Sequence, residues 1–470
     1  MTEQTGRATP FTVTAPASKS LSHRYLIGAG LAAGKSVLRH TLDSADVRAT
    51  AEILRSLGVG IDAASSAGGD LLVCGLRGPV AGGRGHPLPC DVGESGSTCR
   101  LMCAVLATGS GLFRISGHGR MHDRPVGELC RALVSLGAGV VYEGKPGCPP
   151  LILQAQGLNP RLVHGPLPVV MDDSSQYFSA LLLAAPLCPS PLTLMLAGNK
   201  AISWPYVGLT LQVLDDFGVD FCVDVRSAPD AAWHGCAGKS WRKLKDVLPG
   251  CLRVTVIPGC YRAGSFVVEG DWSGASYFLA AGALGKRPVR VRGLRMDSLQ
   301  GDRAMLDILR AMGAAIDVGD DAVTVYPSSL HGIDLDMGNC PDIVPTVAVL
   351  AAFARGSTRI RNVAHLRLKE SDRIAAPVEE LSRIGVTVDE LSDGLLVSGN
   401  NYGNCGPGRP APPYLPEGVG LSAHGDHRMA MALALLELIN PRLSVHDLLD
   451  EPQVVDKSFP DFWEKWRLLL

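Results

Sequence analysis

The chain has 470 residues, of which 46% are hydrophobic, and its 44 Lys and Arg residues nearly cancel its 46 Asp and Glu residues. This length and hydrophobic content predict at least two domains with large cores, while the balanced charge argues against binding to nucleic acid or to an anionic membrane. The apolar stretches are too short to span a bilayer and residues 1–10 lack a signal-peptide core, so a cytoplasmic protein is expected.

The thirteen cysteines form no C-x-x-C pair. They lie mostly in apolar segments such as CRLMCAVLA, which predicts reduced, buried thiols. No metal site is expected from this pattern.

The first distinctive stretch, GAGLAAGKSV (28–37), matches a permissive form of the phosphate-binding P-loop. A P-loop follows a strand and opens a helix, whereas here an Ala/Leu/Gly-rich run of helical length precedes Gly34. We therefore interpret Gly34 as a helix C-cap that leads into a strand. An ATP-dependent kinase is the alternative, but an anion is expected at the other end of the helix, beside Lys19 and Ser20.

Two series of helices alternate along the rest of the chain. Amphipathic helices run into a glycine and then a strand at Gly58, Gly137, Gly218, Gly313 and Gly385. Ala/Leu-rich helices with polar starts begin near residues 18, 93, 172, 271, 339 and 425, and alternating-apolar stretches such as GLFRISG and DAVTVYP supply strands. The pattern predicts an α/β fold in which a β-α-β-α-β-β unit with one buried and one amphipathic helix occurs six times.

The starts of the buried helices carry partial positive charge and unpaired amides. If these starts converge, they form an anion-binding surface. Residues 224–250 interrupt the repeat, and their basic KSWRKLKD run is interpreted as a solvated loop. A boundary near 260–265 gives three units per domain, and the Gly/Pro-rich residues 400–420 are interpreted as a loop.

Ten polar segments in order carry a family resemblance: ASKSLSHR, GESGSTCR, HDRPVGEL, SSQYFSALLLAAP, SWPYV, EGDWSGASYFLAA, PDIVPTVAVLAAFARG, LRLKESDRI, GDHRMAMALALL and DKSFPDFW. Together they resemble the 5-enolpyruvylshikimate-3-phosphate (EPSP) synthase family over nearly the whole chain. The resemblance implies the two-domain enolpyruvyl transferase fold with the active site in the interdomain cleft. It also implies a lower domain of residues 1–20 and 263–470, an upper domain of 21–262, and no cofactor or metal. A monomer is expected by default, because nothing in the exposed amphipathic helices marks an interface.

The family transfers the enolpyruvyl group of phosphoenolpyruvate (PEP) to the 5-hydroxyl of shikimate 3-phosphate and releases phosphate. Both small-molecule substrates are anionic, and Arg suits such groups because it pairs with them in a bidentate manner. The resemblance assigns shikimate 3-phosphate to Lys19, Ser20, Arg24, Ser174, Ser175, Gln176, Ser203, Asp342, His365 and Lys369. It assigns PEP to Lys19, Gly96, Arg124, Gln176, Glu370, Arg373, Arg428 and Lys457.

Addition of a hydroxyl to C2 of PEP with protonation of C3, followed by loss of phosphate and of the C3 proton, needs groups that act as acid and base. By resemblance Asp342 serves the 5-hydroxyl proton, and Glu370 with Lys19 serves the proton at C3. On a helix Lys369 and Arg373 would share a face. Pro377 indicates that the regular helix begins later.

The sequence departs from many family members at three positions. Glu94 replaces Asn and is expected to point toward Arg124 or Lys19, since an unpaired carboxylate beside a PEP site is unfavourable. Leu101 replaces Pro, and His365 replaces an Asn that contacts the shikimate phosphate. Inhibition by glyphosate, the PEP-like inhibitor of the family, is expected because Gly96 has no side chain to exclude it. His427 is expected either to line the cleft or to be structural.

Two further alternatives are a sister enolpyruvyl transferase and a protein of another functional class. A UDP-N-acetylglucosamine enolpyruvyl transferase shares the fold but uses a loop cysteine, whereas here the first cysteine after residue 117 is Cys130, inside a predicted helix. A non-catalytic relative that binds phosphorylated metabolites is the second alternative. The presence together of Lys19, Asp342, Glu370 and Arg428 argues against it.

Overall fold

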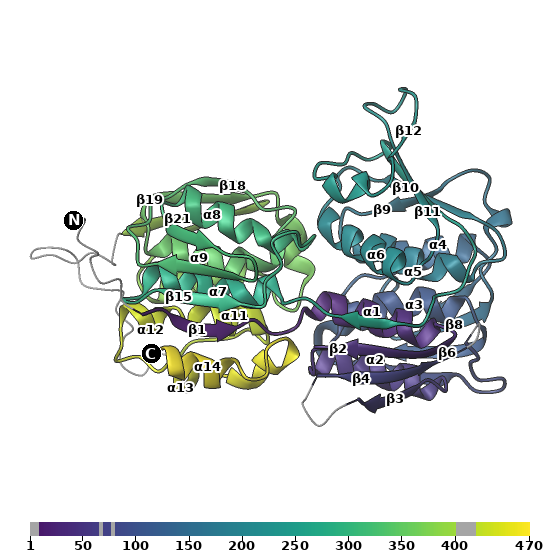
Figure 1. Cartoon of the computed structure of the whole chain (residues 1–470), viewed down its shortest axis with the longest axis horizontal. Helices are drawn as coiled ribbons and strands as arrows, with labels where there is room; N and C mark the ends of the chain where they lie inside the picture. Colours follow the sequence, from purple (N-terminus) through teal and green to yellow (C-terminus); the bar gives the residue numbers. More distant parts are fainter. Residues whose placement is uncertain (1–8, 65–68, 77–79, 401–419) are drawn as a thin grey trace, which may run out of the picture. The chain divides into compact units, whose positions relative to one another are not determined.

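The computed structural model describes residues 9–64, 69–76, 80–400 and 420–470. Contacts divide the chain into unit 1, residues Met1–Pro16 with Glu269–Leu470, and unit 2, residues Ala17–Val268. These limits lie a few residues from those that the sequence suggested at 20 and 262. Figure 1 labels the elements of each unit.

The second repeat of unit 2 shows the predicted β-α-β-α-β-β order most simply. It consists of β5 (Leu88–Asp91), α3 (Gly96–Ala107), β6 (Ser110–Ser116), α4 (Gly127–Ser135), β7 (Gly139–Tyr142) and β8 (Leu151–Gln156). The strands form one sheet in the order β5-β6-β8-β7, in which β5 and β6 are parallel and the other pairs are antiparallel.

The other two repeats of unit 2 follow the same plan. The first has the sheet order β14-β2-β4-β3 and the third has β12-β11-β13-β10-β9. Their elements are α1 (Lys19–Leu31), β2 (Gly34–Arg39), α2 (Ala45–Ser56), β3 (Gly60–Ala63), β4 (Leu71–Gly75), β9 (Leu167–Val170), α5 (Gln176–Ala184), β10 (Leu192–Ala197), α6 (Trp204–Asp216), β11 (Phe221–Val225), β12 (His234–Gly235), β13 (Leu252–Val256) and β14 (Ser265–Val267).

Unit 1 contains two four-stranded sheets, ordered β1-β15-β17-β16 and β18-β19-β21-β20. Their elements are β1 (Phe11–Thr14), α7 (Trp272–Leu284), β15 (Val289–Arg292), α8 (Met305–Ala311), β16 (Ala315–Val318), β17 (Ala322–Tyr326), β18 (Asp334–Asp336), α9 (Val344–Ala352), β19 (Arg355–Arg361), α10 (Ala375–Arg383), β20 (Thr387–Leu391) and β21 (Gly394–Asn400).

The edge strands explain how the chain passes between the units. β1 pairs in parallel with β15 of unit 1, with Phe11 opposite Val289, and Figure 1 shows it in purple among the green and yellow elements of that unit. β14 pairs in parallel with β2 of unit 2, with Ser265 opposite Val37. The N-terminal strand therefore completes a sheet of unit 1, and a strand late in unit 2 completes its first sheet.

The sixth repeat differs from the others in the described residues. After α11 (His427–Leu433) come α12 (Leu436–Ile439), α13 (Val445–Leu448) and α14 (Phe462–Leu469), and a single bridge joins Leu421 to Leu449. Helix replaces strand here because α14 presents apolar residues at helical spacing. Phe462 and Trp466 of α14 lie 5.8 and 5.6 Å from the ring of Phe278 on α7.

The predicted alternation of buried and amphipathic helices is confirmed. Almost every residue of α1, α3, α5, α7, α9 and α11 is buried.

The interpretation of Gly34 as a helix C-cap is wrong, because α1 ends at Leu31 and Gly34 begins β2. Lys35 and Ser36 therefore lie in a strand and not at a helix N-terminus, which excludes a P-loop. The five glycines that follow the amphipathic helices all have positive φ: Gly58, Gly137, Gly218, Gly313 and Gly385.

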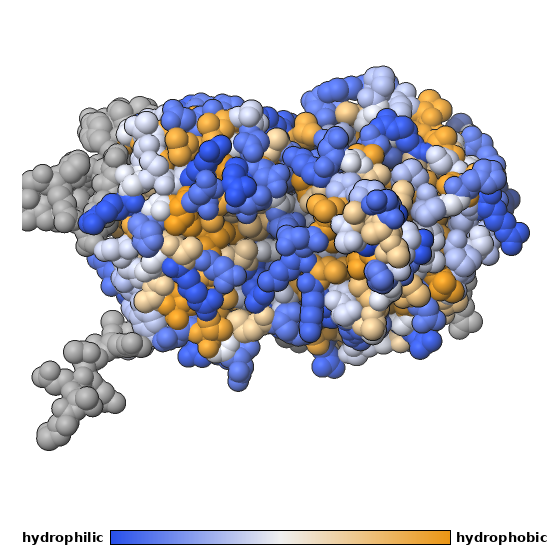
Figure 2. Space-filling model, turned by 90° about the horizontal axis from the view of Figure 1, so that it is seen from above, coloured by the Kyte–Doolittle hydropathy of each residue, from blue (hydrophilic) through white to orange (hydrophobic). Residues whose placement is uncertain are grey.

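The surface is mixed in character. Figure 2 shows hydrophilic and hydrophobic residues interspersed on the face that it displays. Residues 224–250 are largely exposed and contain little regular structure, as expected of a solvated loop. The Gly/Pro-rich loop expected at 400–420 lies almost wholly outside the described residues. Within the described ranges, no helix is both long and apolar enough to cross a membrane.

Candidate active site

The start of α1 carries the first predicted anion-binding residues of unit 2. Lys19 is the first residue of α1, and its Nζ lies 3.1 Å from Asp46 Oδ2 in the first turn of α2. Both side chains are largely buried, and Ser20 follows Lys19 on the helix. The ion pair therefore orients the Lys19 ammonium at this helix start.

Arg24 lies one turn further along α1 and is almost fully buried. Its guanidinium donates to Thr210 Oγ1 at 2.8 Å, to the main-chain oxygens of Ser20 and Tyr206 at 2.8 and 3.1 Å, and to Ser179 Oγ at 3.3 Å. All four acceptors are neutral. Burial lowers the pKa of Arg24 to about 10, so the group keeps its charge at neutral pH. A buried cation held only by neutral oxygens favours a bound anion.

Gly96 begins α3 between two guanidinium groups. A Cβ atom built on Gly96 would lie 2.4 Å from Arg124 Nη2 and 2.7 Å from Arg100 Nη1. Arg124 Nη1 donates to the main-chain oxygen of Glu94 at 3.1 Å, and the Glu94 carboxylate lies over Gly119, where a Cβ atom would overlap it. The predicted pairing of that carboxylate with Arg124 or Lys19 stays a prediction.

Replacing Gly96 with alanine is expected to raise the KM for PEP about tenfold, which corresponds to about 1.4 kcal/mol. The new Cβ atom would displace the guanidinium of Arg124 while the fold is preserved, since the ends of arginine side chains can move. Steady-state kinetics with each substrate varied in turn measures the effect. The KM for shikimate 3-phosphate should change less than twofold, and an unchanged KM for PEP would contradict the prediction.

The start of α5 meets the start of α3. Gln176, the first residue of α5, donates through Nε2 to Ser97 Oγ at 3.0 Å and accepts from Arg100 Nη1 at 2.9 Å. The main-chain N–H of Gln176 donates to Ser174 Oγ at 3.2 Å. Because both the oxygen and the nitrogen of its side-chain amide are bonded, the orientation of the Gln176 side chain is fixed.

Two more predicted serines of unit 2 stand at helix starts. Ser175 precedes α5 and Ser203 precedes α6, and both are buried. Ser203 has a φ of 54°, a left-handed conformation that is uncommon for serine. Strained backbone of this kind tends to occur at functional sites, which supports a binding role for Ser203.

A cluster of ion pairs in unit 1 brings together three of the predicted residues, Arg373, Asp342 and Glu370, with Asp426. Arg373 donates to Asp426 Oδ2 at 2.6 Å and Oδ1 at 3.1 Å, to Asp342 Oδ1 at 2.9 Å and to Glu370 Oε2 at 2.8 Å. Arg373 is 1% exposed. Burial alone would lower the pKa of Arg373, but the carboxylates of Asp426, Glu370 and Asp342 outweigh burial and raise it. Arg373 is therefore a permanent cation at the centre of this cluster.

Asp342 links this centre to the start of α11. It lies in the short helix η6 (Pro341–Ile343), and its Oδ2 accepts from Arg428 Nη2 at 2.6 Å. Lys457 Nζ lies 3.4 Å from the main-chain oxygen of Gly425, three residues before Arg428. Asp342 therefore lies between two guanidinium groups, one bonded to each of its oxygens.

The remaining predicted residues of unit 1 lie near these elements. His365, in η7 (Ala364–Leu368), and His427, the first residue of α11, are almost fully buried. Lys369 is partly buried. The expectation that Lys369 and Arg373 share a helix face is wrong, because α10 begins only at Ala375, as Pro377 indicated.

Three buried residues of these clusters were not selected from the sequence. Asp426 accepts from Ser371 Oγ and the Arg428 amide in addition to Arg373. Arg100 donates twice to the main-chain oxygen of Pro125, next to Arg124. The third residue is Asp302, described below. The Asp that precedes an Arg at a helix start was a usable signal for Asp426, whereas Arg100 and Asp302 had none.

Asp302 lies in η5 (Gly301–Ala304) and is almost fully buried. Its Oδ2 accepts from Ser273 Oγ, and its Oδ1 has no partner among the described residues. Burial, reinforced by the Asp342 carboxylate and opposed by Arg428, raises the pKa of Asp302 to about 7. Asp302 is therefore largely protonated below neutral pH.

Replacing Asp302 with asparagine is expected to stabilise the protein more at pH 8 than at pH 5. An unfolded aspartate ionises near pH 4, so between about pH 4 and 7 the folded state holds a proton that the unfolded state has lost. The free energy of unfolding of the wild type therefore falls as pH rises through this window. Asparagine removes this penalty. Thermal unfolding at both pH values measures it, and a pH-independent difference in Tm would contradict the raised pKa.

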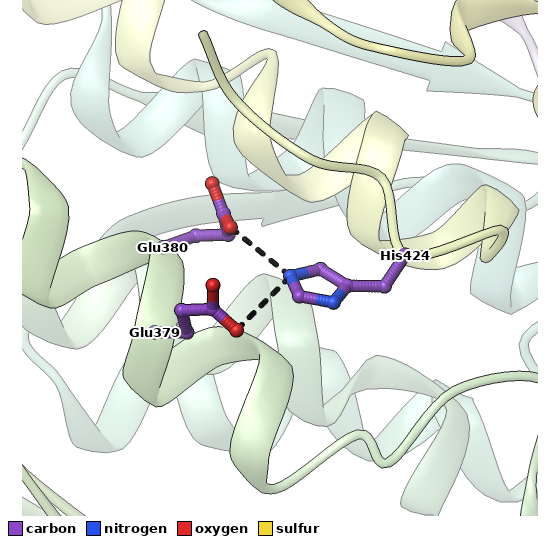
Figure 3. A group of neighbouring side chains, drawn as sticks. All are labelled: Glu379, Glu380 and His424. Carbon is purple, nitrogen blue, oxygen red and sulfur yellow. Dashed lines mark hydrogen bonds and ion pairs between the residues drawn. The ribbon is translucent and has the colours of Figure 1, made fainter. Parts of the chain in front are cut away.

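One group of side chains in unit 1 has the residue types of a metal site. Figure 3 shows the His424 ring facing the carboxylates of Glu379 and Glu380 from α10, with Nε2 3.0 Å from Glu380 Oε1 and 4.0 Å from Glu379 Oε2. Arg383 lies 2.5 Å from Glu379 Oε1 and 3.6 Å from Glu380 Oε1. Because Arg383 already supplies positive charge to both carboxylates, the group fits an ion-pair cluster better than a cation site.

Comparison with known sequences identifies the family to which the chain is related. The sequence profile described as EPSP synthase (3-phosphoshikimate 1-carboxyvinyltransferase) matches residues 4–231 and 249–466. A 3-phosphoshikimate 1-carboxyvinyltransferase of Shewanella halifaxensis is 36% identical over 461 residues, which cover 97% of this chain and 96% of the relative. One from Shewanella amazonensis is 36% identical over 457 residues, which cover 97% and 95%.

Comparison with solved structures confirms the predicted fold. An EPSP synthase from Acinetobacter baumannii superimposes with a TM-score of 0.71 and 22% identity, over 98% of this chain and 96% of that one. The enolpyruvyl transferase NikO from Streptomyces tendae gives a TM-score of 0.67 and 20% identity, over 99% and 95%. With the profile covering almost the entire sequence, the chain belongs to the EPSP synthase (3-phosphoshikimate 1-carboxyvinyltransferase) family, a family of enzymes.

Proposed function

We propose that the protein transfers the enolpyruvyl group of PEP to the 5-hydroxyl of shikimate 3-phosphate, and that the clusters of both units serve this reaction. The main support is the cluster of Asp342, Glu370, Arg373 and Arg428 in unit 1. It combines carboxylates that can exchange protons with guanidinium groups that suit anionic substrates.

In unit 2, the proposed contacts to shikimate 3-phosphate are the helix starts of α1, α5 and α6. Arg24 is a buried cation bound only to neutral acceptors, and a substrate anion would balance its charge. Lys19 and Arg124 supply further positive charge. The proposed set is Lys19, Ser20, Arg24, Ser174, Ser175, Gln176 and Ser203, with Asp342, His365 and Lys369 of unit 1.

The PEP contacts are proposed to be Lys19, Gly96, Arg124, Gln176, Glu370, Arg373, Arg428 and Lys457. Four of the five N–H groups of Arg373 already bind carboxylates. Arg373 therefore acts chiefly by holding Asp342 and Glu370 in place, while Arg428 and Lys457 flank the start of α11.

The proposed chemistry is an addition followed by an elimination. Asp342 accepts the proton of the 5-hydroxyl as the hydroxyl oxygen bonds to C2 of PEP. At the same time Glu370 with Lys19 delivers a proton to C3. The C3 proton then returns to this pair as the bond from C2 to the phosphate oxygen breaks. Arg373 and Arg428 each hold one oxygen of Asp342, and these bonds orient the carboxylate that is proposed to accept the proton.

Phosphate release from PEP with each acceptor tests this proposal. Purified protein with PEP and shikimate 3-phosphate, in buffer containing a chelator and no ATP, should release phosphate. Replacing shikimate 3-phosphate with UDP-N-acetylglucosamine should abolish the release. Turnover with the nucleotide sugar would instead favour the sister enolpyruvyl transferase, and binding of shikimate 3-phosphate without turnover would favour a non-catalytic relative.

The proposal includes a cytoplasmic monomer that acts on small molecules. The twelve cysteines in the described ranges are free thiols, most of them buried, which suits a reducing compartment. Light scattering coupled to size exclusion tests the oligomeric state, with a mass near 49.5 kDa expected.

A further inference from the structure

A continuous line of buried polar side chains lies directly beneath the Lys19–Asp46 ion pair. His23 Nδ1 lies 2.8 Å from Thr50 Oγ1, Thr50 Oγ1 lies 2.8 Å from Thr98 Oγ1, and Thr98 Oγ1 lies 2.8 Å from Ser95 Oγ. All four side chains are at most 1% exposed. We call His23, Thr50, Thr98 and Ser95 the His23 network.

The His23 network joins the N-terminal halves of three helices, α1, α2 and α3. His23 is four residues after Lys19 on α1, and Thr50 is four residues after Asp46 on α2, so the two pairs share helix faces one turn apart. Thr98 lies in the first turn of α3, two residues after Gly96. The network therefore spans from the helix that carries Lys19 to the helix that begins with Gly96.

The direction of the hydrogen bonds follows from the last acceptor. The Thr98 hydroxyl donates its single proton to Ser95 Oγ at 2.8 Å, with the main-chain oxygen of Asp46 as a second acceptor at 3.1 Å. Thr98 then accepts from the Thr50 hydroxyl. Since Thr50 has no second proton, it accepts from His23, which must carry its proton on Nδ1.

The rest of the site keeps His23 neutral. Burial, with Lys19 and Arg24 nearby and only Asp46 opposing them, lowers the pKa of His23 to about 3. His23 Nε2 has no partner among the residues that the structure describes. In the direction given above this atom is a bare lone pair, which costs less to bury than an unpaired N–H. A neutral His23 with its proton on Nδ1 is thus expected from pH 5 to 9.

We propose that the His23 network is a positioning element that fixes Lys19 relative to the Gly96 turn of α3 and thereby sets the affinity for PEP. The inference rests on the proposed function, in which both Lys19 and Gly96 contact PEP. Buried hydroxyls are satisfied only when their helices are placed so that donors meet acceptors. A network in which every hydroxyl is bonded therefore specifies the arrangement of the helices more strictly than apolar packing does. Valine at position 50 or 98 would preserve shape and remove this restriction.

The experiment compares Thr50→Val and Thr98→Val with Thr50→Ser and Thr108→Val. Thr50→Ser keeps the hydroxyl. Thr108 is buried at the opposite end of α3, where its Oγ1 donates to the main-chain oxygen of Val105, so Thr108→Val is a matched loss of a buried hydroxyl. Loss of one buried hydrogen bond suggests a rise of about five- to tenfold in the KM for PEP in the first two variants, with kcat changed less than about twofold.

The double variant Thr50→Val/Thr98→Val should be no worse than either single variant, because both break the same line of bonds. A KM for PEP that is unchanged in the Val variants, or raised equally by Thr108→Val, would overturn the positioning role. Absence of turnover in the wild-type protein would instead refute the proposed function, so the two failures are distinguishable.

A second measurement needs no substrate and uses a variant only to assign the signal. Nitrogen-15 NMR of the histidine side chains should show one ring, assigned to His23 by its absence in His23→Asn, in the neutral Nδ1–H tautomer from pH 5 to 9. A His23 ring that titrates in this range, or that carries its proton on Nε2, would overturn the bonding direction and with it the inference, even if a Val variant failed to fold.

Discussion

Replacing Asp342 with asparagine is expected to lower kcat by about 10²- to 10⁴-fold, the usual loss when a general base is removed. The amide has nearly the same shape but cannot accept the proton of the 5-hydroxyl. The asparagine NH2 group would also face the guanidinium of Arg373 or Arg428, so two donors would oppose each other. Measurement of kcat with both substrates saturating tests this directly.

The control for Asp342 is an aspartate in the same unit that forms an ion pair on the surface. Asp334 lies 2.9 Å from Arg361 and is mostly exposed. Asp334→Asn should keep kcat within about twofold of the wild type, since exposed ion pairs contribute little. A kcat for Asp342→Asn within threefold of the wild type would show that another group accepts the proton.

Replacing Asp426 with alanine is expected to destabilise the protein by about 3–5 kcal/mol, because it leaves a buried cation short of its closest partner. Asp426 is fully buried and accepts two hydrogen bonds from Arg373, one from Ser371 and one from the amide of Arg428. The variant also loses the N-cap of α11, whose first turn carries Arg428. Urea unfolding should show a lower midpoint with an unchanged slope.

Asp426→Asn is the matched variant for this prediction. It keeps an oxygen acceptor for the α11 amide and removes the charge, so its stability should lie between those of the wild type and Asp426→Ala. If the alanine variant lost less than about 1 kcal/mol, the Asp426–Arg373 pair would not be what holds the unit 1 cluster together.

The repeat was predictable because it depends on local rules. Glycines such as Gly58 and Gly137 follow amphipathic helices and have the positive φ that their positions require. The buried helices were recognised because they are apolar on all sides, which only the interior of a domain accommodates. The pairing of β14 with β2 was not predictable, since the sequence of a three-residue strand does not indicate which strand it pairs with.

The candidate site was predictable only in part. Family-like segments supplied Lys19, Asp342 and Arg428, and Pro377 correctly indicated a late start for α10. Asp426 reads in the sequence as an ordinary N-cap, which it also is. Its second role as the partner of Arg373 depends on a contact across 53 residues.

The His23 network has no signature in the sequence. His23, Thr50 and Thr98 lie within helices and Ser95 is an N-cap, and Thr50 and Thr98 are 48 residues apart. Only the packing of α1, α2 and α3 brings these hydroxyls into line. Local periodicity in the sequence cannot predict long-range polar contacts of this kind.

The most direct test of the central claim is phosphorus NMR of a single reaction. The purified protein is mixed with equal amounts of PEP and shikimate 3-phosphate in the presence of a chelator and without ATP. The account predicts that the PEP signal is replaced by inorganic phosphate while the shikimate phosphate signal converts, one for one, to that of a new phosphate monoester. Phosphate release without the second product, or unchanged spectra with active, folded protein, would contradict it.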